Sequence, residues 1–128
     1  MREILFRGKR VDNGEWVQGD LLQNVDCLKI REQEKDIKHI AKSFVVIPET
    51  VGQYTGLTDK NGTKIFEGDI VKTKKGKPYE IKVYKGCWAV WNGNFKNDYE
   101  RWDFLNTFNS RVEIIGNITD NPELLGGD

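Results

Sequence analysis

The stretch Gly52–Lys72, GQYTGLTDKNGTKIFEGDIVK, holds the strongest local folding signal in the chain. Two runs that alternate apolar and polar residues flank Asn61-Gly62. Asn-Gly in this position predicts a β-hairpin, because both residues accept a positive φ in a type I′ turn. The stretch then reaches Gly68-Asp69 and the apolar pair Ile70-Val71. We therefore expect a hairpin here and interpret it as the folding centre of the protein.

A similar arrangement occurs earlier, where Asn13-Gly14 is followed by Trp16-Val17 and then by Gly19-Asp20. One hypothesis is an internal duplication with a shared site at Asp20 and Asp69. The other, which we favour, is that each glycine supplies a bulge and each aspartate caps the following turn. The Asn-to-Asp spacing is seven residues in one copy and eight in the other. Turn chemistry accommodates that difference more easily than a paired site does.

The remaining sequence predicts a mainly β fold, a small antiparallel β-barrel or sandwich. The expected strands share an alternating or β-branched pattern and are Phe44–Ile47, Tyr79–Tyr84, Cys87–Trp91 and Arg111–Ile118, the last with a bulge at Gly116. A Gly-Asp pair, two aliphatic residues, a basic hairpin and two more strands indicate an SH3-like barrel in the C-terminal part. The N-terminal part reads as a β-hairpin region.

Three segments are less regular. Between Asn24 and Ser43 we favour a strand pair with a charged tip, although Ile37–Phe44 also has the spacing of one helical face. The aromatic residues of Phe95–Asn109 fit either a helical turn or a packed loop. Asn121-Pro122 places an N-cap residue before proline at the first helical position, which predicts a short C-terminal helix.

Length and net charge limit the number of domains and the classes of partner that the sequence predicts. A chain of 128 residues predicts one domain (1–128), with a possible division into an N-terminal β region (1–50) and a barrel-like part (51–125). Such a chain buries a core without metal or disulfide help. Twenty basic and twenty acidic residues give no net charge, so no global field steers the protein toward nucleic acid.

The cysteines, the histidine and the N-terminus point away from zinc, secretion and membranes. Cys27 and Cys87 are accompanied by a single histidine, His39, whereas a structural zinc site needs four N or S ligands. Met1 is followed at once by charged residues rather than by an apolar signal segment. No run approaches the roughly eighteen apolar residues of a membrane span. We expect a cytoplasmic protein with reduced thiols and no cofactor.

The central stretch also carries a resemblance. Gln53–Gly62 and Ile65–Val71 resemble the signature of the YopX family, and Met1–Arg7, Ile115–Ile118 and Asn121–Leu124 agree with it. The resemblance implies a small, mostly β protein encoded by a phage or prophage, acting in the cytoplasm of the bacterial host. It implies no established biochemical role and brings no catalytic residues.

Local charge defines the candidate binding surface. From Ile70 to Val90 there are six lysines and one acid, whereas residues 91–128 hold three basic and seven acidic residues. Lysines beside aromatic rings can bind single-stranded nucleic acid through phosphate contacts and stacking. The candidate nucleic-acid or partner surface consists of Lys72, Lys74, Lys75, Lys77, Tyr79, Lys82 and Lys85. Alternatively, the aromatic rings face the core while the lysines protect an edge strand. A third possibility is a homo-oligomer in which this hairpin meets the acidic part of another copy.

No catalytic pattern is evident, and we expect no enzyme activity. Metal-dependent hydrolysis needs several converging carboxylates, but the candidates all lie near turns: Asp20, Asp59, Asp69, Asp98 and Asp103. The sequence has no GxSxG, P-loop or Cys-His spacing that would mark a nucleophile. The leading hypothesis is a non-catalytic protein-interaction or self-assembling module. The alternatives are a nucleic-acid binder that uses the hairpin of residues 72–85 and, third, a metal-dependent hydrolase.

Overall fold

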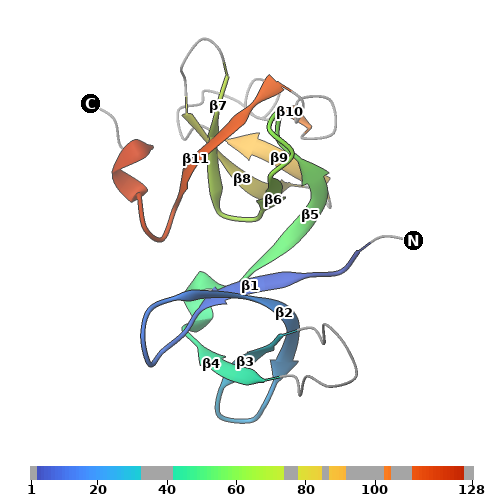
Figure 1. The fold of residues 1–128 in the computed structure, drawn as a ribbon. Helices are drawn as coiled ribbons and strands as arrows, with labels where there is room; N and C mark the ends of the chain where they lie inside the picture. The colour runs from blue at the N-terminus through green and yellow to red at the C-terminus, as the bar shows by residue number, and fades with distance from the viewer. Residues whose placement is uncertain are drawn as a thin grey trace. The chain divides into compact units, whose positions relative to one another are not determined.

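Every strand pairing described in the structure is antiparallel, which confirms a mainly β fold (Figure 1). The structure is a computed structural model that describes residues 3–32, 42–73, 78–84, 87–91, 103–104 and 111–125. It divides into two units, residues 1–54 and 55–128, and each is described by itself.

The first unit is built from four short strands and the start of a fifth. They are β1 (Phe6–Lys9), β2 (Trp16–Gln23), β3 (Leu28–Arg31), β4 (Ser43–Val46) and β5 (Gly52–Thr58), in the spatial order β4-β3-β2-β1-β5. A single 3₁₀ turn at Pro48–Thr50 follows β4. The predicted strand pair between Asn24 and Ser43 is confirmed by β3 and β4, while its charged tip lies outside the described residues.

The sheet of the first unit curls until β4 approaches the end of β1 (Figure 1). Arg10 forms an isolated bridge with Val46, supported by hydrogen bonds from Val11 N to Val45 O (3.0 Å) and from Ile47 N to Lys9 O (2.8 Å). This is one bridge rather than a strand pairing, so the sheet remains open. Apolar side chains at alternate positions fill the concave side, with Val17, Ile30 and Val46 buried at its centre.

Two glycines permit this curl. A Cβ on Gly8 would lie 3.1 Å from Val46 Cβ, and a Cβ on Gly19 would lie 1.9 Å from the carbonyl oxygen of Arg31. Gly19 and Asp20 lie in the middle of β2, and Asp20 is exposed and pairs with Arg31 of β3. The prediction that Asp20 caps a turn was wrong. Gly19 is required there by the close passage of another backbone.

Both Asn-Gly pairs within the described residues form turns, but neither is the predicted type I′ turn; Asn92-Gly93 lies outside those residues. In the second turn, Gly62 N donates to Asp59 O (3.0 Å), so Lys60 and Asn61 are the central residues and Gly62 follows with φ 83°. That arrangement is a turn followed by a left-handed glycine, as in longer hairpin loops. In the first turn, Arg10 N donates to Glu15 O, which encloses a four-residue loop.

The second unit continues from β5 into β6 (Lys64–Phe66) and then forms a five-stranded sheet. Its strands are β7 (Asp69–Lys72), β8 (Pro78–Tyr84), β9 (Cys87–Trp91), β10 (Asp103–Phe104) and β11 (Glu113–Asn117), in the order β10-β9-β8-β7-β11. The core contains Ile65, Val71, Ile81 and Val112, all fully buried. Neither sheet of the described residues closes into a barrel, so the SH3-like barrel is not confirmed.

The C-terminal segment departs from the predicted helix. Pro122–Leu124 forms one 3₁₀ turn, and no side-chain cap bond is made at Asn121. The predicted bulge at Gly116 is confirmed, because the register of β11 against β7 shifts between Ile114 and Gly116. The described part of the chain contains no helix long and apolar enough to cross a membrane.

Candidate functional site

The predicted lysine-rich surface lies only partly within the described residues. Lys72 is exposed at the end of β7, and Tyr79 and Lys82 are half-buried on β8. The other four members, Lys74, Lys75, Lys77 and Lys85, lie outside the described residues.

Tyr79 does not share a face with the two described lysines. It pairs directly with Val71, and opposite residues in an antiparallel ladder project to the same side. Tyr79 accordingly packs against the buried cluster that contains Val71 and Ile81. Its ring contacts the core rather than standing beside Lys72 and Lys82 as a stacking surface.

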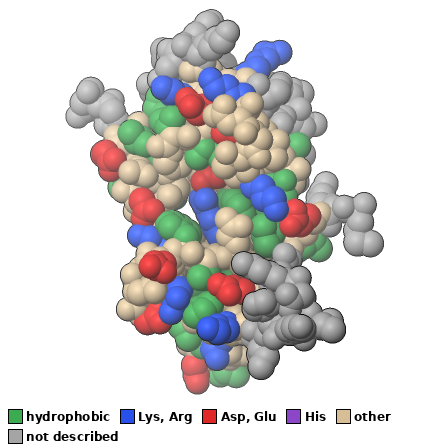
Figure 2. Space-filling model, viewed as in Figure 1, with side chains coloured by type: hydrophobic (Ala, Val, Ile, Leu, Met, Phe, Trp, Pro, Cys, Tyr) green, Lys and Arg blue, Asp and Glu red, His purple; other side chains and the backbone are tan. Residues whose placement is uncertain are grey.

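The opposite face of β7 and β8 carries both signs of charge. Lys72 pairs with Glu113 of β11. Glu80, which is two residues before Lys82 in β8, pairs with Ile70 of β7. Over the visible surface of the described residues, basic and acidic side chains are likewise interspersed (Figure 2). The described part of the hairpin thus presents a mixed charge pattern.

Glu80 is the described group on this face whose protonation is most affected by its surroundings. Its side chain is 9% exposed beside the fully buried Ile70. Burial raises the pKa of Glu80 above its ordinary value; the charge of Glu67 adds to the rise and that of Lys82 opposes it. Glu80 is therefore more easily protonated in the folded protein than in the unfolded chain.

Asp59 organises the turn between β5 and β6. Its side chain is 6% exposed, and Oδ1 accepts hydrogen bonds from Asn61 N and Thr63 N, both at 2.9 Å. Oδ2 accepts a third bond from Ile114 N at 3.0 Å. A buried carboxylate that accepts three backbone N–H groups is a structural acceptor, because each bond satisfies a donor that would otherwise be desolvated.

The Asp59 turn also covers the outer edge of β11. β11 is the terminal strand of its sheet, and such an edge can recruit other chains through its unpaired backbone groups. Lys60 N donates to Val112 O (3.0 Å), while Asp59 takes the N–H of Ile114. Farther along, Asn121 Oδ1 accepts from Asn117 N (3.3 Å). The chain's own residues thus occupy this edge at three places.

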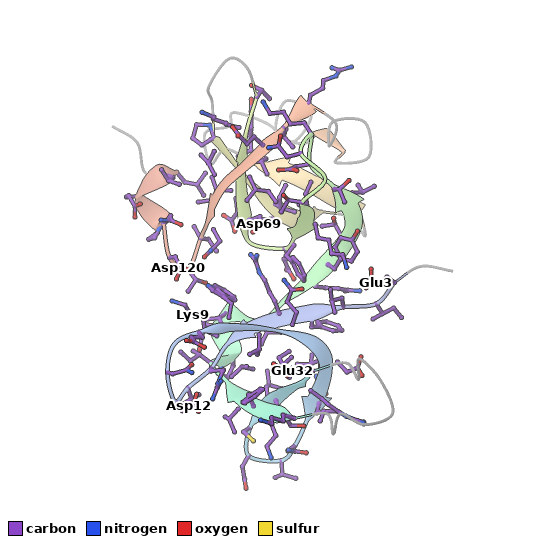
Figure 3. All side chains as sticks on the ribbon, in the orientation of Figure 1. Glu3, Lys9, Asp12, Glu32, Asp69 and Asp120 are labelled. Carbon is purple, nitrogen blue, oxygen red and sulfur yellow. The ribbon has the colours of Figure 1, made fainter. Side chains whose placement is uncertain are left out.

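Gly68 and Asp69 hold the turn between β6 and β7 through hydrogen bonds (Figure 3). Gly68 has φ 91°; its N–H donates to Ile81 O (3.0 Å), and its carbonyl accepts from Ile118 N (2.8 Å). Asp69, 2% exposed, accepts a hydrogen bond from Phe66 N at 2.7 Å. Asp69 thus holds the turn that precedes it, between β6 and β7, and Gly68 belongs to that turn, whereas we predicted a bulge at the glycine and a cap on the following turn.

The turn after β11 is likewise held by hydrogen bonds from side chains to the backbone. A Cβ on Gly116 would lie 2.6 Å from Asn121 Oδ1, so only glycine leaves room for that side chain. Asn117 Oδ1 accepts from Asp120 N (2.8 Å) and Thr119 N (3.1 Å). These residues fix the end of β11 and are engaged in turn formation.

Comparison with known families identifies the family of this chain. The sequence model of the YopX protein family matches residues 5–126. The chain belongs to the YopX family. No curated protein matches it in sequence. Among solved structures, it is similar to protein EF1440 from Enterococcus faecalis, with a TM-score of 0.57 and 22% identity over 98% of this chain and 99% of that one. That similarity concerns the fold.

The residues behind the YopX resemblance therefore hold turns and strand edges together. The interpretation of Asp59 as a turn-capping residue is confirmed by its bonds to Asn61 N and Thr63 N, since aspartate commonly bonds the backbone two residues on. Its bond to Ile114 N was not predicted. Among the described residues, no three His, Cys, Asp or Glu side chains form a group that could hold a metal. Asp98 and the side chain of Asp103 lie outside what the structure describes.

The first unit of this YopX family member exposes an apolar cluster, defined as Val11, Val45 and Ile47. Their side chains are 59%, 40% and 36% exposed. Val11 lies opposite Val45 where the end of β1 meets β4, and Ile47 is two residues from Val45, on the same side of the strand. Single exposed apolar residues are normal, but a contiguous group marks a candidate contact surface.

Proposed function

We propose that this YopX family member is a non-catalytic interaction module that self-associates through the apolar cluster. The observation that carries the proposal is the placement of Val11, Val45 and Ile47 side by side with their side chains in solvent. Association that removes these side chains from water is favourable in proportion to the apolar area covered.

Two further features support a second copy as the partner. β4 is hydrogen-bonded to β3 on one edge and to residues 9–11 on the other, which favours contact through side chains over strand addition. The chain has no net charge, so two copies do not repel each other through their overall fields. As part of the same proposal, the family resemblance supports a phage or prophage accessory protein acting in the host cytoplasm.

Size-exclusion chromatography with light scattering over a range of concentrations tests the proposal. We expect a concentration-dependent increase in mass that Val45→Lys abolishes. Val25→Lys is the matched control, because Val25 is fully exposed in the turn between β2 and β3, outside the apolar cluster. A monomer at high concentration in both low and high salt contradicts self-association. Equal behaviour of the two variants contradicts the assignment to this cluster.

The lysine-rich hairpin supports a second candidate function, nucleic-acid binding. Lys72 and Lys82 project from the same face, and four more lysines belong to the same segment. Fluorescence anisotropy with short DNA and RNA at low salt should show binding that Lys74→Glu/Lys75→Glu weakens. Lys42→Glu/Lys60→Glu changes the charge equally elsewhere and serves as control. Absence of binding to either nucleic acid contradicts this function.

A metal-dependent hydrolase is the third hypothesis. It predicts a divalent metal bound to the purified protein, because metal-dependent hydrolysis needs the ion to activate water. Elemental analysis of protein prepared without chelators is the test, and a metal-free sample contradicts the hypothesis.

A further inference from the structure

Two Asn-Gly pairs in the described residues are chemically comparable. Asn13-Gly14 and Asn61-Gly62 are both exposed, and both glycines have a positive φ, 73° and 83°. In each pair the glycine N–H donates to a backbone carbonyl at 3.0 Å, from Gly14 to Arg10 and from Gly62 to Asp59. A glycine nitrogen is sterically open to attack the preceding asparagine side chain, because it carries no Cβ.

The pairs differ in the hydrogen bond to the asparagine side-chain oxygen. Asn13 Oδ1 accepts a bond from Glu15 N, two residues on, at 2.9 Å. At the second site, the equivalent donor is Thr63 N, which donates instead to Asp59 Oδ1 at 2.9 Å. The side-chain oxygen of Asn13 is thus held by a backbone donor, whereas Asp59 takes the corresponding donor away from Asn61.

This difference matters for attack on the asparagine amide. When a nitrogen adds to Cγ, negative charge develops on Oδ1, and a donor placed about 2.7–3.1 Å from that oxygen stabilises the transition state. The Glu15 N–H meets this condition before any reaction begins. The same bond forms an Asx turn between the Asn13 side chain and the backbone two residues on.

We propose that Asn13 is a site of spontaneous deamidation and that Glu15 N–H promotes the reaction there relative to Asn61. The Gly14 nitrogen forms a bond to Asn13 Cγ and gives its proton to solvent. The Cγ–Nδ2 bond breaks, and the amide leaves as ammonia after taking a proton from water. Water then opens the cyclic imide at either carbonyl, giving aspartate or isoaspartate, with no change of oxidation state.

The product alters the loop between β1 and β2. Either product adds a negative charge beside Asp12, and isoaspartate also adds a methylene to the backbone. Arg10 N to Glu15 O and Gly14 N to Arg10 O are the bonds that define this loop, so a longer backbone disturbs both. The modification therefore changes the loop adjoining Val11.

Peptide mapping by mass spectrometry tests the proposal on the intact chain incubated at mildly alkaline pH. We expect the native protein to convert Asn13 severalfold faster than Asn61. In denaturant the two rates should converge, because both asparagines then precede glycine in an unstructured chain. Glu15→Pro removes the N–H donor and should slow conversion at Asn13, whereas the control Glu15→Ala keeps the donor and the rate.

Two outcomes overturn the proposal. One is a native Asn61 rate equal to or greater than the Asn13 rate, and the other is equal rates at Asn13 in folded Glu15→Pro and Glu15→Ala. If circular dichroism shows that Glu15→Pro does not fold, the ratio of the two rates in the unsubstituted native protein, set against the ratio in denaturant, decides the matter.

Discussion

The carboxylate of Asp59 accepts a hydrogen bond at 3.0 Å from the backbone N–H of Ile114, fifty-five residues later in the chain. The same carboxylate holds Asn61 N and Thr63 N of its own turn. One side chain therefore fixes the turn between β5 and β6 and attaches that turn to the outer edge of β11.

Replacing Asp59 should cost more than one ordinary hydrogen bond. In Asp59→Asn, one carboxylate oxygen becomes an NH₂ group, which cannot accept a hydrogen bond from a backbone N–H. At least one buried N–H then lacks an acceptor, and we expect the free energy of unfolding to fall by about 2–4 kcal/mol. Urea denaturation measures it, and Asp26→Asn in the exposed turn after β2 is the control. We also expect increased light scattering on storage, because the β11 edge loses its cover. A loss no larger than that of Asp26→Asn contradicts this role.

Gly19→Ala should be strongly destabilising. The new methyl would lie 1.9 Å from Arg31 O, and a backbone atom cannot move away as a flexible side chain can. We expect a cost of about 3 kcal/mol or more, at the upper end for overpacking. Gly14→Ala is the matched control; its Cβ meets nothing within 4 Å, so it pays only the left-handed penalty of about 1–2 kcal/mol. Equal costs for the two variants would show that β2 and β3 can separate locally.

Glu80→Gln should stabilise the protein at neutral pH. Burial raises the pKa of Glu80 above its ordinary value of 4.5, so folding favours the protonated carboxyl. The stability that this group contributes is fully present below pH 4.5 and is lost as the pH rises through the raised folded pKa. Urea denaturation at several pH values should show the variant's advantage growing from pH 4 to pH 7. An advantage that does not change over this range contradicts the assignment.

The pKa of Asp12 should depend on Arg10. Arg10 donates to both carboxylate oxygens, at 2.9 and 2.6 Å, and this hydrogen bonding lowers the pKa of Asp12 below its ordinary value of 3.8. In Arg10→Met we expect the pKa, followed by carboxyl-carbon NMR, to rise toward 3.8. Lys9→Met removes a nearby charge without that bond and should change the pKa less. The stabilisation from the pair is present at neutral pH and is lost as the pH falls through the lowered pKa.

Local sequence patterns predicted the strands well, because the alternation of apolar and polar residues is a property of each strand's own sequence. Strict alternation placed β8 at Tyr79–Tyr84, one residue shorter than the observed strand, and the expected strand Phe44–Ile47 is β4, shifted by one residue. At Gly68-Asp69 the association of aspartate with a turn was predicted correctly, because Asp69 bonds a residue only three positions away, although the turn precedes the aspartate instead of following it. The similar pair Gly19-Asp20 was misinterpreted, because its glycine is required by the backbone of Arg31 in β3, twelve residues away.

The candidate site was harder to predict for the same reason. Tyr79 and the lysines are neighbours in sequence, but whether a side chain faces the core depends on which strands pair across the sheet. The apolar cluster could not be anticipated either. Val11 and Val45 are thirty-four residues apart, and they meet through the curl of the first sheet. That curl depends on the close approach of the Val46 side chain to Gly8 and of the Arg31 backbone to Gly19.

The position of β1 has a consequence for synthesis on the ribosome. β1 lies between β2, which follows it directly, and β5, whose Gln53 pairs with Phe6. Translation proceeds from the N-terminus, so one side of β1 stays without its partner until more than forty further residues have emerged. Slow passage of the ribosome through residues 10–53 would prolong the time in which the nascent chain presents this strand to chaperones or to neighbouring nascent chains.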